Sequence, residues 1–321
     1  SGSTTILTHA TDTSNIGLGA NAVDSITTGD YNVGLGDNAG TAITTGSYNT
    51  SLGINALASN TTAIFNTAIG YNALDANVTG QENTAVGLEA LKVNTAHYNT
   101  AVGSKALTAN TTGTQNVAIG KSALYANTTG SYNVSVGYNA LDANTTGTQN
   151  VAIGRAALTA STTASNNTGI GMSALESTTT GANNTAVGYQ AGYNTNTGIR
   201  NVAIGTSAFF SNTTGSYNTA SGYVAMFNNT TGEKNTTYGY ASLMCNTTGV
   251  NNTASGYKAL YANTTGAKNT GVGYQALCSN TTGNQNVAVG NCALGGTTSG
   301  GYNTASGYTA LVANTTGGHN T

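Results

Sequence analysis

The sequence predicts an all-β protein, a parallel β-solenoid (β-roll) of about eighteen 17-residue coils. The first observation is a unit, TTGSYNVSVGYNALDAN at 128–144, that returns along nearly the whole chain. The second is an asparagine followed four residues later by a glycine, both recurring at this period. The third is a short stretch of strand-like alternation in each unit. A fixed short period is typical of architectures in which equal coils stack on one another.

The recurring asparagine, called the marker asparagine here, fixes the register of the repeat. It stands at Asn15, Asn32, Asn49, Asn66, Asn83, Asn99 and every seventeenth residue from there to Asn320. The step from Asn83 to Asn99 is one residue shorter. We therefore predict a leader at 1–10 and a single repeat domain at 11–321. The last unit begins but is not completed, so we expect the repeats to continue beyond the C-terminal end.

Composition excludes several classes of function. The 321 residues contain eight Lys plus Arg and ten Asp plus Glu, which gives a net charge of −2. Such a chain has no basic patch for nucleic acid or for an anionic membrane surface. No apolar stretch is long enough to span a bilayer, so we predict no membrane insertion. Aliphatic residues at fixed offsets argue against a disordered chain.

The strand signal lies in Asn-Val-Ser-Val-Gly at 133–137. Alternation places Val134 and Val136 on one face and Ser135 on the other, and we predict the aliphatic face to be the interior. Four coils have a different residue at the second aliphatic position: Ser221, Tyr238, Ser255 and Ser306. The sequence leaves open whether the interior is hydrated there or the register differs.

The middle residue of this stretch is almost always Ala, Gly or Ser. Small residues along a strand usually mark the close approach of another backbone. We therefore predict an inter-chain packing strip that consists of Ala68, Ala85, Ala101, Ala118, Ala152 and Ala203.

The second half of each unit, x-x-Ala-Leu, supplies another interior contact. It contains Leu57, Leu74, Leu91, Leu107, Leu124, Leu141 and Leu158. Four residues are too few for a stable helix, so we predict a second short strand in each coil. The TTG glycine and the glycine after the strand are expected at turns with positive φ.

These motifs resemble two families of fibrous surface proteins. Asn-Val-Ala-Ile-Gly at 116–120, 150–154 and 201–205, followed by x-x-Ala-Leu-x-Ala, resembles the head repeats of YadA-type trimeric autotransporter adhesins. The longer string at 184–192 and 269–286 is similar to repeat shafts of phage tail fibres and related bacterial surface proteins. The resemblance implies a left-handed β-roll packed as a trimer, although the adhesin period is shorter than 17 residues.

No constellation of residues predicts catalysis, a metal site or a cofactor. His9, His97 and His319 are scattered, and Asp75 and Asp142 share an offset but lie four coils apart. A catalytic triad or a metal site needs such groups to converge. We therefore predict that the chain is not an enzyme and needs no cofactor.

Cysteines give no disulfide signal. Cys245, Cys278 and Cys292 fall at three different offsets of the unit, so we predict three unpaired residues that fill small spaces.

Three files of polar or aromatic residues leave alternatives open. Asn-Thr-Thr is formally an N-glycosylation acceptor, but a ladder of amides from coil to coil is favoured. These asparagines are Asn60, Asn110, Asn127, Asn144, Asn212, Asn229, Asn246, Asn263, Asn280 and Asn314. Tyrosines recur at two offsets; cross-coil stacking is favoured over a glycan-binding face. Files of threonine suggest ice binding as a further alternative, although two adjacent threonines place their hydroxyls on opposite faces.

The sequence thus predicts a structural shaft or head of an extracellular trimeric fibre, either a surface adhesin or a phage tail fibre. It would act as a stiff spacer with adhesive contacts, located at a cell surface or on a virion. Its expected partners are copies of itself, as a homotrimer or fibre, and surface glycans or a host receptor contacted through a tip outside this sequence. The alternative is a glycan-binding, glycosylated or ice-binding β-solenoid that uses the Tyr or Thr files.

Overall fold

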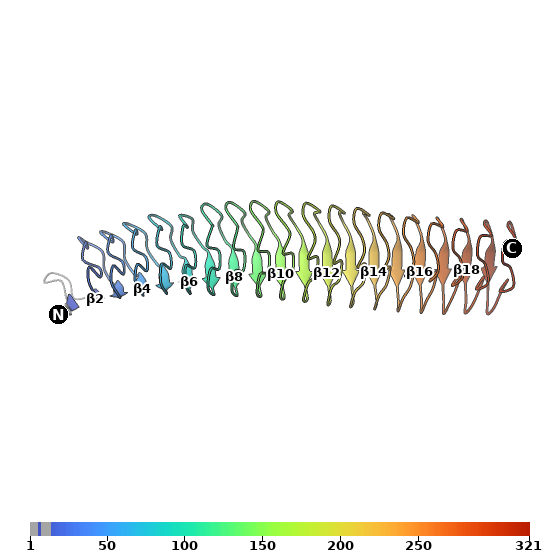
Figure 1. Ribbon diagram of the computed structural model, residues 1–321, viewed down its shortest axis with the longest axis horizontal. Coiled ribbons are helices and arrows are strands. Elements are labelled where there is room, and N and C mark those ends of the chain that lie inside the picture. Colours follow the sequence, from blue (N-terminus) through green and yellow to red (C-terminus); the bar gives the residue numbers. More distant parts are fainter. Residues whose placement is uncertain (1–5, 8–13) are drawn as a thin grey trace. The chain divides into compact units, whose positions relative to one another are not determined.

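The computed structural model describes residues 6–7 and 14–321. The chain forms two compact units, Ser1–Ala164 and Ser165–Thr321, and each is a stack of the same coil (Figure 1). The described residues contain strands and turns and no helix. The prediction of a parallel β-solenoid with 17-residue coils is confirmed. Trimer packing and a single domain over 11–321 stay predictions.

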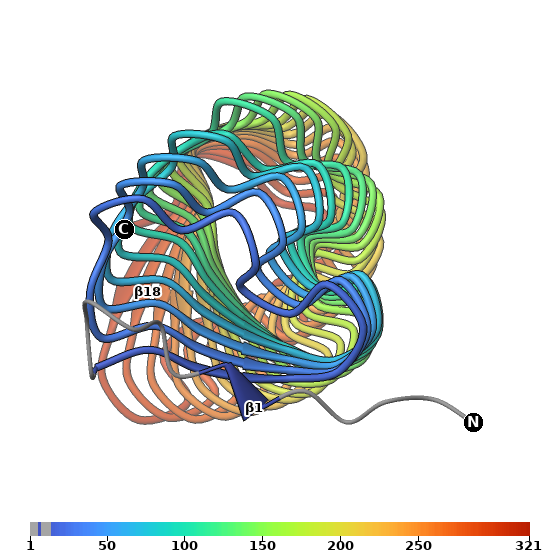
Figure 2. The ribbon, with the colours of Figure 1, turned by 90° about the vertical axis from the view of Figure 1, so that its left-hand side faces the viewer.

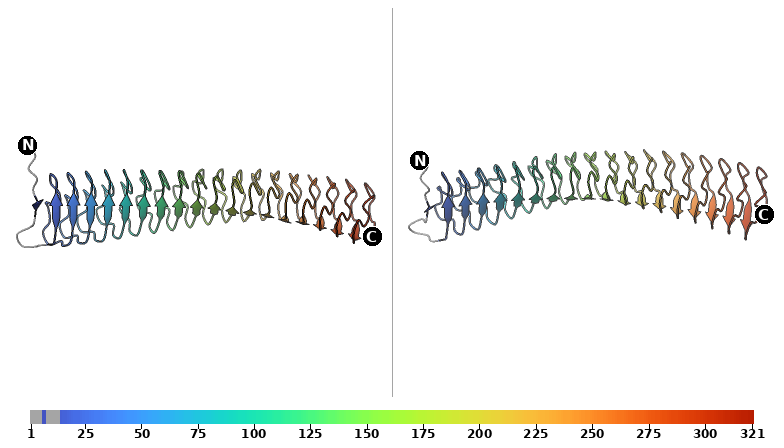
Figure 3. Two further views of the ribbon diagram at one scale, coloured as in Figure 1. Left: turned by 90° about the horizontal axis from the view of Figure 1, so that it is seen from below. Right: turned by 60° about the horizontal axis from the view of Figure 1, so that its bottom comes forward.

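Each coil contributes one strand of three residues, and the strands of each unit lie in a row on one side of the coils (Figure 3). The strands of the first unit are β1 (Ile6–Leu7), β2 (Ile16–Leu18), β3 (Val33–Leu35), β4 (Thr50–Leu52), β5 (Thr67–Ile69), β6 (Thr84–Val86), β7 (Thr100–Val102), β8 (Val117–Ile119), β9 (Val134–Val136) and β10 (Val151–Ile153). Those of the second unit are β11 (Thr168–Ile170), β12 (Thr185–Val187), β13 (Val202–Ile204), β14 (Thr219–Ser221), β15 (Thr236–Tyr238), β16 (Thr253–Ser255), β17 (Thr270–Val272), β18 (Val287–Val289) and β19 (Thr304–Ser306).

Strand pairing follows the repeat register. Within each unit neighbouring strands are parallel, and equivalent residues face each other, as in Val117↔Val134 and Val202↔Thr219. The one-residue deletion between Asn83 and Asn99 does not disturb the pairing of Thr84 with Thr100. The exception in direction is β1, from the predicted leader, which pairs antiparallel with β2.

The two faces of the strand are reversed relative to the prediction. The middle residue of each strand is buried, and the two flanking residues point outward; Ser135 is fully buried, whereas Ile119 is 41% exposed. The coil is thin, because the Ser135 hydroxyl reaches across the interior and donates to the Ala140 carbonyl at 2.7 Å. Only a small side chain fits between the strand and this turn.

The alanine strip is therefore an interior feature. Ala68, Ala85, Ala101, Ala118 and Ala152 have no exposed surface, and Ala203 has 2%. The prediction that these residues pack against a second chain was wrong, because their own coil already covers them. The same geometry answers the question raised by Ser221 and Tyr238: their position faces outward, and their coils keep the common register.

The second half of the coil is a turn and not the second strand that the sequence predicted. Residues 137–143 form this turn, in which Asn139 and Leu141 both have a φ of 52°. Left-handed residues at alternate positions are incompatible with an extended strand. The predicted role of the leucines is nevertheless confirmed, since the seven named leucines from Leu57 to Leu158 are fully buried.

Two glycines per coil serve different purposes. Gly137 has a φ of 141°, as predicted for a turn, and a Cβ there would lie 2.5 Å from the Gly154 carbonyl oxygen. The TTG glycine, Gly130, does not have a positive φ, contrary to the prediction. It is needed for close approach, since its Cβ would lie 2.3 Å from the Gly147 carbonyl oxygen.

The marker asparagines form a continuous buried ladder within each unit. The Oδ1 atom of Asn218 accepts the backbone N–H of Asn235 at 3.0 Å and its side-chain amide at 3.2 Å. The Nδ2 atom of Asn218 donates to Asn201 Oδ1 at 3.2 Å and to the Gly232 carbonyl at 2.9 Å. Each marker asparagine thus connects its own coil to the coils before and after it.

The asparagines of Asn-Thr-Thr form a second ladder beside the first, since Asn116 of the marker ladder and Asn127 both donate to the Gly130 carbonyl at 2.9 Å. In the first unit Asn127 donates to Asn110 Oδ1 at 2.7 Å, and the second unit repeats this contact from Asn229 to Asn280. Ser161, Thr178 and Thr195 occupy this position elsewhere, and in the described chain their buried hydroxyls have no hydrogen-bond partner. The interior of a coil therefore contains leucine and alanine together with two adjacent files of amides. Viewed along the stack, the successive coils of each unit lie one behind another (Figure 2).

We expect Asn218→Ala to destabilise the fold strongly. The substitution removes the bonds to Asn201 and Gly232 and leaves the buried amides of Asn235 without their acceptor. The cost should be roughly 3 kcal/mol or more. Denaturant unfolding measures it, and Asn228→Ala is the matched control, because the repeat has Ala at this position in other coils, as at Ala143. Equal losses in both variants would contradict the role of the ladder.

Filling the interior beside the strand should also destabilise the single chain. Ala118→Leu adds volume at a fully buried position, and we expect a loss of about 3 kcal/mol from overpacking. Ile119→Leu, on the exposed face of the same strand, should change the stability by less than about 0.5 kcal/mol. Thermal unfolding at several protein concentrations gives the answer. If Ala118→Leu altered only the association of chains, the observed strand orientation would be refuted.

Candidate functional site

Because the interior is closed by its own side chains, functional contacts must lie on the outer surface. One candidate is the outer strand face, which we define as the first and third residues of strands β2–β19. In the first unit every third residue is aliphatic: Leu18, Leu35, Leu52, Ile69, Val86, Val102, Ile119, Val136 and Ile153. No strand residue of this face carries a charge. Five of these nine side chains are exposed and the other four are half-buried, and a row of apolar side chains that are open to solvent is typical of an interaction site.

The outer strand face differs between the units. In the second unit Ser221, Tyr238, Ser255 and Ser306 interrupt the aliphatic row. The first unit therefore has the longer uninterrupted apolar row.

Tyrosines that occupy the same offset in successive coils stack on one another, as favoured by the sequence. Tyr31, Tyr48 and Phe65 have ring centroids 4.9 and 5.1 Å apart. The longest stack has spacings of 5.1–5.4 Å and consists of Tyr223, Tyr240, Tyr257 and Tyr274. Its rings are 39–53% exposed, so this stack also presents an aromatic surface to solvent.

A third aromatic stack was not predicted from the sequence. Tyr193, Phe210 and Phe227 stack at 5.0 and 4.9 Å with nearly parallel rings. Their common offset in the unit was the available signal, but two of the three residues are phenylalanines and do not belong to a tyrosine file.

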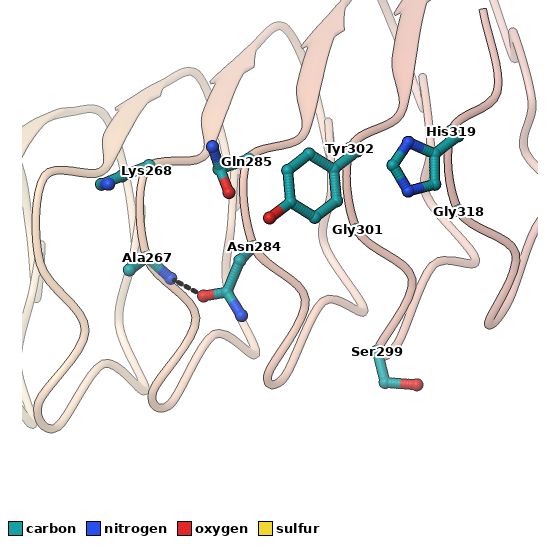
Figure 4. A pocket seen from close by; sticks show the side chains of 9 residues that line it. All are labelled: Ala267, Lys268, Asn284, Gln285, Ser299, Gly301, Tyr302, Gly318 and His319. Carbon is teal, nitrogen blue, oxygen red and sulfur yellow. Dashed lines mark hydrogen bonds between the residues drawn. The ribbon is translucent and has the colours of Figure 1, made fainter.

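A shallow groove of about 490 Å³ lies in the second unit (Figure 4). It is lined by the two residues that follow TTG in successive coils. Its lining includes Lys268, Asn284, Gln285, Gly301, Tyr302 and His319. The His319 ring stacks on Tyr302 with centroids 4.8 Å apart and an interplanar angle of 4°. The groove therefore combines an aromatic platform with amide and ammonium groups.

The proposed glycosylation sites are mostly inaccessible in the folded chain. Asn60, Asn110, Asn127, Asn144, Asn212, Asn229, Asn246, Asn263 and Asn280 are fully buried, and Asn314 is half-buried. The side-chain amides from Asn110 to Asn144 and from Asn229 to Asn280 donate within the second ladder. The ladder interpretation is confirmed over these stretches, and a glycan on their Nδ2 atoms would require the coil to open.

The histidines and cysteines of the described residues do not converge on one site. His97 Nδ1 accepts the Gln81 N–H at 3.0 Å, His319 belongs to the groove, and His9 lies outside the described residues. Across residues 14–321 no group of three or more His, Cys, Asp or Glu side chains could hold a metal ion. Cys245, Cys278 and Cys292 are unpaired, and burial raises the pKa of the Cys245 thiol. The absence of enzyme activity and of a cofactor stays a prediction.

Compared with known proteins, the chain matches no family model, no curated protein and no solved structure. Within the described residues, no helix is long and apolar enough to cross a membrane. Assignment of function therefore depends on the surfaces described above.

Two aspartates share one repeat position but have different surroundings. Burial raises the pKa of both the Asp75 and the Asp142 carboxyl groups, and the Lys92 ammonium partly counteracts this only at Asp75. A raised folded-state pKa means that the folded chain binds the proton more tightly than the unfolded chain, so stability falls as the pH rises through that pKa.

We therefore expect Asp142→Asn to raise the melting temperature at neutral pH, where the native carboxylate is ionised. The gain should disappear below the ordinary pKa of 3.8, where the carboxyl is protonated in both states. Asp75→Asn should give a smaller gain, because it also removes a charge near Lys92. Melting curves of the three proteins across this pH range provide the measurement. A gain for Asp142→Asn that is independent of pH would show that desolvation of the charge is not its cause.

Proposed function

We propose that the chain is a structural repeat shaft or head of an extracellular fibre, a surface adhesin or a phage tail fibre, and that it assembles as a homotrimer. The observation that carries this proposal is the uncharged aliphatic row on the outer strand face of the first unit. Ile119 is 41% exposed and Leu52 is 42% exposed, and equivalent residues recur in every coil of the row.

The regularity of this face supports an interface between chains. In each of nine coils two side chains of the strand point outward, and the third residue of the strand is aliphatic in all nine. A parallel arrangement of identical chains would align the coils of one copy with those of the next, so that one contact repeats along the row. The outward aliphatic row thus provides the basis for association that the buried alanines cannot.

A stiff spacer is the mechanism that fits the interior. Each coil is bonded to its neighbours through the strand and the marker-asparagine ladder. Most coils add the second ladder and a threonine contact such as Thr128 Oγ1 to the Thr145 carbonyl at 3.0 Å. Bending or opening a coil would break several of these bonds together. Such a shaft would project an adhesive tip away from a cell or virion surface.

A second candidate function is glycan binding along the stack of Tyr223, Tyr240, Tyr257 and Tyr274. Exposed aromatic rings can pack against the apolar face of sugars, and this stack presents four of them in register. Solid-phase glycan binding with a Tyr240→Ala variant tests it. Ice binding is less favoured, because the first hydroxyl of many Thr-Thr pairs already donates to the next coil.

We expect Ile119→Asp to dissociate the assembly while leaving the coil folded. A carboxylate at the centre of an apolar interface would have to be desolvated without a partner, which should shift the equilibrium towards monomer. Analytical ultracentrifugation should give three times the 31.9 kDa of one chain for the unaltered protein and a smaller mass for the variant.

Tyr125→Asp is the control, since Tyr125 is equally exposed, at 40%, but lies in the turn. A monomeric unaltered chain at micromolar concentration would refute the trimer. Dissociation by both variants would place the interface elsewhere.

A further inference from the structure

The groove in the second unit contains two backbone amides to which the neighbouring coil offers no side-chain acceptor. In several coils the N–H of the residue after TTG donates to a side chain at the same position of the next coil. Ile199 donates to Ser216 Oγ at 3.1 Å, and Ala267 donates to Asn284 Oδ1 at 2.7 Å (Figure 4). The next two residues at this position are Gly301 and Gly318, which have no side chain to accept such a bond.

As a result, the N–H groups of Asn284 and Gly301 have no hydrogen-bond partner among the described residues. They belong to successive coils, so their spacing is about 4.8 Å. The missing side chains at Gly301 and Gly318 also make room for the groove. A ligand oxygen there could take the place of the serine hydroxyl that other coils provide.

The charges around the groove favour an anion. The sequence contains no Asp or Glu after Glu233, whereas Lys234, Lys258 and Lys268 follow it. Lys268 lines the groove and forms no ion pair with the described residues. An anion would therefore meet an ammonium group and two N–H donors without a competing carboxylate.

The stacked rings of Tyr302 and His319 indicate that the ligand contains a sugar. Tyr302 is 54% exposed and stacks on His319, so its ring can pack against the apolar face of a sugar. The Gln285 side-chain amide and the Asn284 Nδ2 group, which donates to no other described residue, can donate to hydroxyls of the ligand. The volume of about 490 Å³ is in the range of small-molecule sites.

We propose that this groove binds a saccharide that carries a carboxylate, such as a uronic-acid oligosaccharide. The carboxylate accepts the Asn284 and Gly301 N–H groups and pairs with Lys268, while a sugar ring packs on Tyr302. This site goes beyond the role of a shaft, because it combines free amides, which other coils also have, with Lys268 and Tyr302 in one groove.

The experiment uses the full chain, a galacturonic acid trisaccharide and its fully methyl-esterified form, which keeps the sugar rings but removes the charge. In calorimetric titration the acidic probe should bind at least about tenfold more tightly than the ester, as a charge-assisted contact implies. Lys268→Gln should abolish this preference. Equal affinity for the two probes, or no binding of the acid up to about 10 mM, would overturn the proposal.

Gly301→Ser provides the second, independent variant. Its hydroxyl would accept the Asn284 N–H and occupy the groove, so the affinity should fall about tenfold. Serine occurs at this position in other coils, as at Ser216, and the new Cβ would lie 3.0 Å from the Asn284 carbonyl oxygen, a tight contact. Melting curves confirm that the variant is folded.

Ala182→Ser makes a matched change at the same repeat position outside the groove. Identical affinities of Gly301→Ser and Ala182→Ser would refute the role of the free amides. Inorganic sulfate that competes as well as the acid does would show a site for any anion and overturn the saccharide assignment. The same samples in the ultracentrifuge separate this proposal from the fibre: a monomer that binds the acid excludes only the trimer.

Discussion

The marker-asparagine ladder is the interaction on which the rest of the coil depends. From Tyr31 onward the residue before each marker asparagine has a left-handed conformation, as at Tyr132 with a φ of 62°, and the strand begins directly after the marker. Together with Asn139 and Leu141 this makes three non-glycine residues per coil in a region that costs about 1–2 kcal/mol each. Strands of three residues cannot offset that cost alone. The buried amides of Asn133, which bond to the coils on both sides, hold the corner in place.

A thin coil follows from this arrangement. With one leucine, two alanines and two amide files inside, no space remains for a valine or isoleucine from the strand. The aliphatic residues must therefore face outward, where they provide an apolar surface that the interior does not use. The constraint that keeps the interior small thus also makes the outer strand face available for association.

Sequence reasoning captured what depends on periodicity and missed what depends on the width of the coil. The register, the buried leucines and the second asparagine ladder all follow from the period. Alternation around Ser135 defines two faces but contains no information about which is inside; that depends on the 2.7 Å contact with Ala140 across the coil. The groove could not be predicted from the sequence either. Gly301 matters because it has no side chain to accept the Asn284 N–H of the preceding coil.

The residues that stabilise the coil and the residues that are free to bind a ligand occupy different positions of the repeat. The asparagines, the leucine and the glycines recur because each bonds or packs against its copy in the next coil, so a change there propagates to both neighbours. The two residues after TTG face outward and vary freely, as Ala267, Lys268 and Gly301 illustrate. The sign of the charged side chains also varies along the chain. No Lys or Arg precedes Lys92, and no acidic residue follows Glu233. Since the framework tolerates almost any residue at such positions, a binding site needs only two or three neighbouring coils to differ from the rest. A stack of nearly equal coils can therefore carry a local recognition site without any change of fold.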